Sequence, residues 1–185
     1  MLQRLIDDMN KALSANCYFA ALSIALMLPD ICGKAAYPNC KVGDRYKAWY
    51  DEFVGKYEVP PTNESCPDDT KMSYLSGEVV YSLRNSFLHQ GTPNIEPEKI
   101  KAEENKIDNF SLIIGSKKKF DIYPDISGLG NGKIRTYSVN IRRLCIIIGA
   151  SASAYYKENK SKFNFFNYTI IDWDQEVEKM KRLRH

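Results

Sequence analysis

Apolar residues recur at helical spacing over residues 2–28, and this feature limits the fold of the chain more than any other. Successive apolar positions are three or four residues apart, so they line one face of a helix. These positions are Leu2, Ile6, Met9, Leu13, Cys17, Ala20, Ile24 and Met27. Pro29 and Gly33 follow, and we expect them to end the helix. The pattern predicts a mainly α-helical fold that begins with one long helix.

Four later segments also have the spacing or the caps of helices. They are residues 44–53, 70–90, 141–159 and 175–184. Asp44, Thr70 and Asn140 are the expected N-caps of the first three, and the last is short and charged. Gly91 lies where the second of these helices should end. We therefore expect an up-and-down helical bundle.

Residues 107–139 have a different pattern, with short runs of β-branched and aromatic residues between turn signals. Residues 110–114 and 120–123 predict an antiparallel hairpin, and residues 133–139 predict a third strand after a glycine-rich turn. We expect a small antiparallel β hairpin or three-stranded flap inserted into a single domain that covers residues 1–185.

Composition excludes several classes of protein. With 26 basic and 23 acidic residues, the formal net charge is only +3, too small for a protein that holds duplex DNA mainly through its phosphates. The five cysteines include no C-x-x-C pair, and the two histidines are His89 and His185, so we expect no metal and no cofactor. The longest apolar stretch, residues 17–28, is shorter than the roughly 20 residues of a membrane-spanning helix. These observations indicate a cytoplasmic protein without a membrane partner.

Five polar side chains lie in one sector of the helix expected at residues 70–90. With Arg84 at zero and a rotation of about 100° per residue, Tyr81 lies near 60°, Asn85 near 100°, Glu78 near 120° and His89 near 140°. Burying such a stripe without partners would cost several kcal/mol. It should therefore face water, a second subunit or a ligand.

The Arg84 and His89 pair has the chemistry that cleaves RNA through its own 2′-hydroxyl. A guanidinium presents donors matched to phosphate oxygens, and an imidazole both takes and gives a proton near neutral pH. We expect His89 to abstract the 2′-proton or to protonate the 5′-leaving oxygen, while Arg84 holds the phosphate. Asn85 orients the imidazole or binds a phosphate oxygen, and Glu78 and Tyr81 are supporting residues. This reaction requires no metal.

The segment YSLRNSFLHQG at residues 81–91 resembles the signature of the HEPN superfamily (higher eukaryotes and prokaryotes nucleotide-binding domains). In that signature an arginine, a polar residue, a short variable run and a histidine lie near the end of one bundle helix. Arg84, Asn85 and His89 match it residue by residue, and the order of the expected helices agrees in outline. The resemblance implies a homodimer with a composite site, RNA or nucleotide as ligand, and endoribonuclease activity as a toxin or defence effector with a possible antitoxin protein.

Two other functions are compatible with the same residues. The first is a catalytically inactive HEPN module that binds a nucleotide, an RNA or a protein partner. The second is a structural helical dimer whose polar stripe seals the subunit interface. Four further residues could line an RNA path, although ordinary loop or surface roles are the simpler interpretation: Asp30 and Lys34 in the loop expected after the first helix, and Arg142 and Arg143 at the start of the helix expected at residues 141–159.

Overall fold

The fold consists of α-helices with one small sheet between the fourth and fifth. The computed structural model describes residues 1–57, 75–115, 123–129, 132–166 and 169–183, with the backbone alone at residues 104, 123–129 and 132–135. The α-helices are α1 (Leu2–Ser14), α2 (Tyr18–Ala36), α3 (Val42–Phe53), α4 (Gly77–Asn85), α5 (Ile141–Glu158) and α6 (Trp173–Arg182). A five-residue π-helical turn, η3 (Ser86–Gln90), continues α4. Short 3-10 helices lie at Gly55–Tyr57, Pro97–Lys99, Glu103–Asn105 and Lys160–Phe163. The predicted mainly α-helical class is confirmed.

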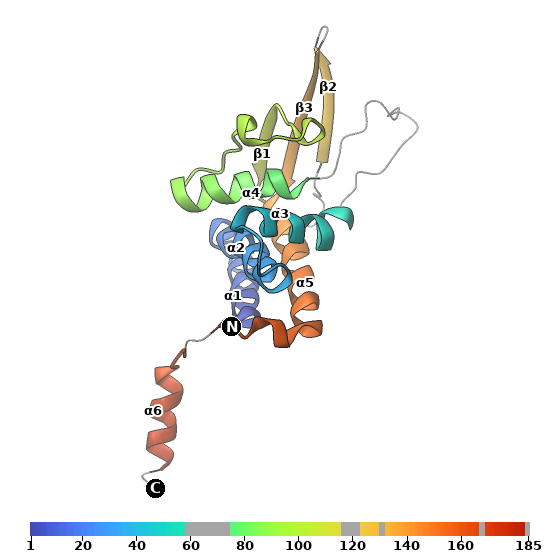
Figure 1. Cartoon of the computed structure of the whole chain (residues 1–185). Coiled ribbons are helices and arrows are strands. Elements are labelled where there is room, and N and C mark those ends of the chain that lie inside the picture. Colours follow the sequence, from blue (N-terminus) through green and yellow to red (C-terminus); the bar gives the residue numbers. More distant parts are fainter. Residues whose placement is uncertain (58–74, 116–122, 130–131, 167–168, 184–185) are drawn as a thin grey trace.

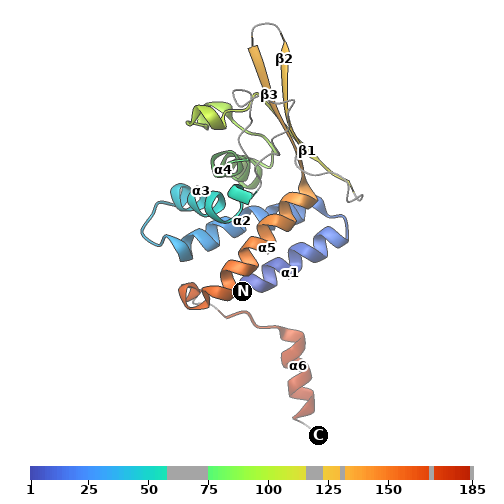
Figure 2. The ribbon, with the colours of Figure 1, turned by 90° about the vertical axis from the view of Figure 1, so that its right-hand side faces the viewer.

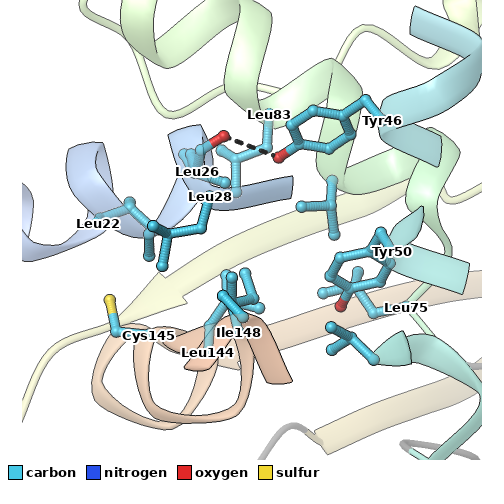
Figure 3. Close-up of a cluster of buried hydrophobic side chains, with 14 of the residues drawn as sticks. Leu22, Leu26, Leu28, Tyr46, Tyr50, Leu75, Leu83, Leu144, Cys145 and Ile148 are labelled. Atoms are coloured by element: carbon cyan, nitrogen blue, oxygen red, sulfur yellow. Dashed lines mark hydrogen bonds between the residues drawn. The ribbon is translucent and has the colours of Figure 1, made fainter. Parts of the chain in front are cut away.

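Helix α2 lies at the centre of the helical part and contacts α1, α3, α4 and α5. Figures 1 and 2 show α3 above the group formed by α1, α2 and α5, with α4 above α3. Figure 3 shows the core that α2, α3, α4 and α5 share. Its labelled members include Leu22, Leu26 and Leu28 of α2, Tyr46 and Tyr50 of α3, Leu83 of α4, and Leu144 and Ile148 of α5. Because α2 packs against both α3 and α4, it fixes the position of α4 and of the polar residues that α4 carries.

The prediction of one long first helix is wrong, because a turn at residues 15–17 divides it. Asn16 has φ 57°, a left-handed conformation that asparagine adopts more readily than most residues. Leu2, Ile6, Met9 and Leu13 are buried in α1 as predicted. Beyond the turn, the buried positions are Ala21, Leu22, Ala25 and Leu26 instead of Ala20, Ile24 and Met27. The turn therefore rotates the buried face of α2 by about one residue.

The prediction that Pro29 and Gly33 end this helix is also wrong, because both lie inside α2. An interior proline removes the backbone donor that would bond the carbonyl of Ala25, and at the next residue the Tyr46 hydroxyl donates to the carbonyl oxygen of Leu26 at 3.1 Å. Gly33 allows close contact with α3, since a Cβ atom there would lie 2.6 Å from the carbonyl oxygen of Arg45. The helix thus continues past its expected end and brings Asp30 to the side of α3.

By length and composition, α2 is the one helix in the described part of the chain that could cross a membrane. Half of its most apolar 18-residue window is buried by the other helices. This is the burial expected of a core helix in a bundle.

Helix α4 begins later than predicted. Its N-cap is Ser76, whose hydroxyl accepts from the amide of Val79 at 3.3 Å, whereas the expected cap, Thr70, lies outside the described residues. The amide of Gly77 also donates to the carboxylate of Asp51 on α3, at 2.6 Å. A Cβ atom at Gly77 would lie 2.6 Å from the carbonyl oxygen of Lys47, so α4 crosses α3 at close range.

The inserted sheet has three strands, but their pairing differs from the prediction. The strands are β1 (Asn109–Ile113), β2 (Tyr123–Leu129) and β3 (Gly132–Asn140), in the spatial order β1-β3-β2. The antiparallel hairpin predicted over residues 107–123 is not supported, because β1 pairs with β3 and runs parallel to it, and residues 120–122 of the expected partner strand lie outside the described residues. Strand β2 instead forms the antiparallel pair with β3. Figure 1 shows this sheet beyond α4, on the side away from α1.

Two helices in the second half of the chain follow their predictions closely. Asn140 caps α5 by accepting from the amide of Arg143 at 3.2 Å. Gly149 of α5 lies against Met9 of α1, where a Cβ atom would come within 2.5 Å of the methionine methyl carbon. Gly149 therefore allows α1 to pack closely against α5. The charged C-terminal helix is present as α6, and Figures 1 and 2 show it extending away from the other helices.

Candidate functional site

A change of helix type brings Arg84 and His89 together. In a regular α-helix, residues five apart are about 140° apart around the axis, which would separate the two side chains. Here the chain changes to a π-type turn at Ser86–Gln90, and the amide of Gly91 ends it by donating to the carbonyls of both Phe87, at 3.1 Å, and Ser86. Such turns bond residue i to i+5, the spacing between Arg84 and His89, and are frequent at functional sites. The guanidinium Nη1 lies 2.8 Å from Nε2 of His89.

Two serine hydroxyls hold the chain that returns alongside this turn. Ser86 is fully buried and its hydroxyl donates to the carbonyl of Asn94. One helical turn earlier, the hydroxyl of Ser82 accepts from the amide of Glu96 at 3.2 Å. Gly91, with φ 71°, makes the reversal between them. The π-helical turn is thus supported from its buried side while His89 faces solvent.

The guanidinium of Arg84 connects all three residues of the predicted motif. Its Nη1 donates to Oδ1 of Asn85 at 3.0 Å and contacts Nε2 of His89. A guanidinium keeps its protons at any physiological pH, so Nε2 must be the acceptor and the imidazole proton lies on Nδ1. The structure therefore places Arg84, Asn85 and His89 in one contact group, with Arg84 at its centre.

Asp30 anchors this group from α2, and sequence reasoning missed that role. Its Oδ2 lies 3.5 Å from Nη2 of Arg84, and its Oδ1 lies 3.1 Å from Nη2 of Arg45 on α3. The Arg84, Arg45 and Asp30 side chains are 17%, 16% and 25% exposed, so the three charges are largely shielded from water. One carboxylate thus bridges two guanidinium groups from different helices. The sequence carries one signal for it, an acidic residue directly after Pro29 in an otherwise apolar segment.

The two arginines retain donors that protein atoms do not use. Among the described residues, Nε of Arg84 and Nε of Arg45 have no hydrogen-bond partner, although both atoms are buried. Two positive charges against one carboxylate leave this junction of α2, α3 and α4 with an excess of positive charge. This excess would attract an anion with several acceptor oxygens, such as a phosphate, to the junction, although the buried Nε atoms themselves are closed to it.

Glu78 does not contact Arg84, in contrast to its predicted supporting role. Its carboxylate accepts from the amides of Lys101 and Ala102, at 2.8 and 3.2 Å, and from the Asn105 side chain at 3.3 Å. Burial raises the pKa of this carboxyl, but these hydrogen bonds and the charge of Lys47 outweigh burial, so the pKa lies below its usual value. Glu78 fixes the loop between α4 and β1.

Tyr81 also packs away from His89. Its ring lies 5.1 Å from the ring of Tyr46, centroid to centroid. A Cβ atom at Gly43 would lie 3.1 Å from the ring of Tyr81. Tyr46 in turn is near Arg84, whose charge lowers the pKa of the Tyr46 hydroxyl, while the larger effect of burial raises it. Tyr81 therefore supports Arg84 only through the packing of α3 against α4.

Other candidate groups give no metal site. Within the described ranges, no three His, Cys, Asp or Glu side chains are arranged to hold a metal ion. Cys32 and Cys145 are buried, and burial raises the pKa of both thiols, that of Cys145 to about 12. Cys17 and Cys40 are exposed.

The chemistry open to this site follows from these contacts. His89 is exposed and carries a lone pair on Nε2, which the adjacent guanidinium now occupies. A phosphate is a stronger acceptor for a guanidinium than a neutral imidazole is, so a bound phosphate would release Nε2 to accept a proton.

Comparisons with family models, with curated proteins and with solved structures found no match to this chain.

Proposed function

We propose that this protein is a metal-independent endoribonuclease of the HEPN type. The observation that supports the proposal most is the 2.8 Å contact between Nη1 of Arg84 and Nε2 of the exposed His89, formed by a π-helical turn. Arg84, Asn85 and His89 act together, and Asp30 serves as a positioning residue for Arg84. The substrate is RNA, and the proposed setting is the cytoplasm, where the protein acts as a toxin or defence effector.

In the proposed reaction, Arg84 exchanges its contact with His89 for a contact with the substrate phosphate. A phosphodiester takes the donors of Arg84, and Nε2 of His89 then accepts the 2′-proton while the 2′-oxygen bonds to phosphorus. The bond from phosphorus to the 5′-oxygen breaks, and this oxygen takes its proton from water or from a protonated His89 of a second copy. The products are a 2′,3′-cyclic phosphate and a 5′-hydroxyl. A homodimer with facing α4 helices is part of this proposal, and a partner antitoxin protein would cover the same face.

Removal of either motif side chain tests the proposal. His89→Ala should lower the rate of RNA cleavage in EDTA by about 100- to 10,000-fold, because a general acid–base group is lost. Arg84→Ala should lower it by at least about 100-fold, because one phosphate contact is lost. The control is Arg4→Ala, an exposed arginine on α1. Circular dichroism checks that the helices persist, and equal cleavage by the wild type and both motif variants would remove the catalytic assignment.

A second function, an inactive HEPN module that binds RNA, a nucleotide or a protein partner, is favoured by a different observation. Arg84 is already engaged by Asp30, Asn85 and His89, so an incoming phosphate must compete for its donors. Fluorescence anisotropy with a labelled RNA separates the two functions. Binding that Arg84→Ala removes, without cleavage by the wild type, would support the binding module and exclude the nuclease.

A further inference from the structure

Helix α6 presents an apolar line that the rest of the chain leaves uncovered. Trp173, Val177 and Met180 follow one another at steps of four and three, so they lie within about 60° of one another around the axis. Trp173 is 65% exposed and Met180 49% exposed, and no residue of α6 is buried. Figures 1 and 2 show the helix extending away from the bundle. An exposed apolar line of this kind indicates a contact surface.

A helix this short needs such a contact. Isolated helices of fewer than about 12 residues are marginal in water, and α6 has 10 residues. Its own cap, Asp172, accepts from the amide of Gln175 at 3.2 Å, and two pairs of oppositely charged residues lie along it. The charged pairs each contribute only a few tenths of a kcal/mol, and the cap contributes about 1 kcal/mol. The helix therefore gains most of its stability when its apolar line is covered.

The charges of α6 indicate what covers it. The acidic residues Asp174, Glu176 and Glu178 all precede the basic residues Lys179, Lys181 and Arg182, so the two halves of the helix carry opposite charge. An amphipathic helix that lies on a membrane surface has a polar face rich in Lys and Arg, whereas the charges of α6 balance. Another α6 in antiparallel orientation would place each half against the half of opposite charge.

Two charged residues set this orientation. Asp174 and Lys181 both lie about 80–100° from Trp173 around the axis, on the same side of the apolar line. Positions that flank an apolar seam choose the partner and its direction. In an antiparallel pair related by a two-fold axis, Asp174 of each copy faces Lys181 of the other, which gives two such contacts. A parallel pair would instead place the flanks that carry Asp174 and Lys181 on opposite sides of the seam, so neither residue would meet its partner.

We propose that α6 pairs antiparallel with α6 of a second copy of this chain, with the apolar line of Trp173, Val177 and Met180 at the contact. This pairing does not depend on the proposed nuclease function. A pair of ten-residue helices buries less surface than the roughly 1,200 Å² of a stable interface. The contact is thus weak by itself, with a dissociation constant on the order of 100 µM.

The test uses the full chain and two charge variants. Asp174→Lys and Lys181→Asp should each raise the dissociation constant about tenfold, because each turns both contacts into repulsions. An equal mixture of the two variants should associate about as tightly as the wild type, because the mixed pair restores both attractions. The control is Glu98→Lys, which changes the charge equally at an exposed residue outside α6 and should alter association less than about threefold.

Sedimentation equilibrium between about 10 µM and 1 mM brackets a contact of this size. A wild type that stays monomeric would overturn the pairing. A dimer whose dissociation constant is unchanged in both single variants would also overturn it, and would leave the surface of α4 as the dimer contact. Fluorescence of Trp173 provides a second measurement, since the other tryptophan, Trp49, is fully buried. A shift to shorter wavelength as the protein is concentrated supports the pairing. A shift seen only with anionic phospholipid vesicles would overturn it in favour of a membrane surface.

Discussion

The bridge from Asp30 to two arginines should make a large and measurable contribution to stability. At an effective dielectric constant of about 20, the attraction across each of the contacts at 3.1 and 3.5 Å is roughly 5 kcal/mol. Repulsion between the guanidinium groups and the cost of removing three charges from water offset much of this. Loss of one member of a largely buried charge group typically costs about 3 kcal/mol, because the remaining charges stay unpaired.

Asp30→Asn isolates this effect, because it removes the charge and keeps the shape of the side chain. A loss of about 3 kcal/mol corresponds to a fall in melting temperature of roughly 6–12 °C for a domain of this size. The control is Asp8→Asn, whose carboxylate is 3.4 Å from Lys11 but 48% exposed. An exposed pair contributes little, so we expect this control to melt within about 2 °C of the wild type.

Differential scanning calorimetry of both variants decides the matter. If Asp30→Asn melts as close to the wild type as Asp8→Asn does, the two arginines do not depend on Asp30 and the proposed positioning role is lost. A further measurement concerns the reaction itself. We expect Asp30→Asn to reduce RNA cleavage about 10- to 100-fold, because Arg84 loses the contact that fixes its position.

Two further substitutions test other contacts of the site. Glu78→Gln should destabilise the protein at neutral pH, since the pKa of Glu78 is lower in the folded state than in the unfolded one. That contribution is present above the unfolded pKa of about 4.3 and disappears as the pH falls through the pKa of the folded state. The urea unfolding curves of variant and wild type should therefore converge in acid. A difference in stability that persists in acid would contradict this explanation. Gly33→Ala should cost about 1–3 kcal/mol, because the new Cβ atom would lie 2.6 Å from the backbone oxygen of Arg45, and an unchanged melting temperature would show that α2 and α3 can separate without penalty.

Local patterns in the sequence predicted the elements better than their arrangement. The apolar spacing in α1 and the cap of α5 at Asn140 depend on neighbouring residues, and both predictions are confirmed. The turn at Asn16 was not predictable from spacing, because apolar steps of three and four continue across it. The partner of β1 was also hidden, since a run of β-branched residues indicates a strand but not its neighbour.

The site shows the same division between local and distant information. Arg84, Asn85 and His89 were found from their spacing within one segment. The contact between Asp30 and Arg84 joins two helices far apart in sequence, and no local pattern encodes it. The π-helical turn was equally hidden, because a regular helix was the expectation for every residue up to Gln90.

The junction at Asn140 has a practical consequence for anyone who removes the inserted strands. Asn140 is at once the last residue of β3, paired with Ile113 of β1, and the side chain that caps α5. A deletion that includes Asn140 would leave the first amides of a central helix without their acceptor, at a cost of about 1 kcal/mol. A shortened chain should therefore be joined ahead of Asn140.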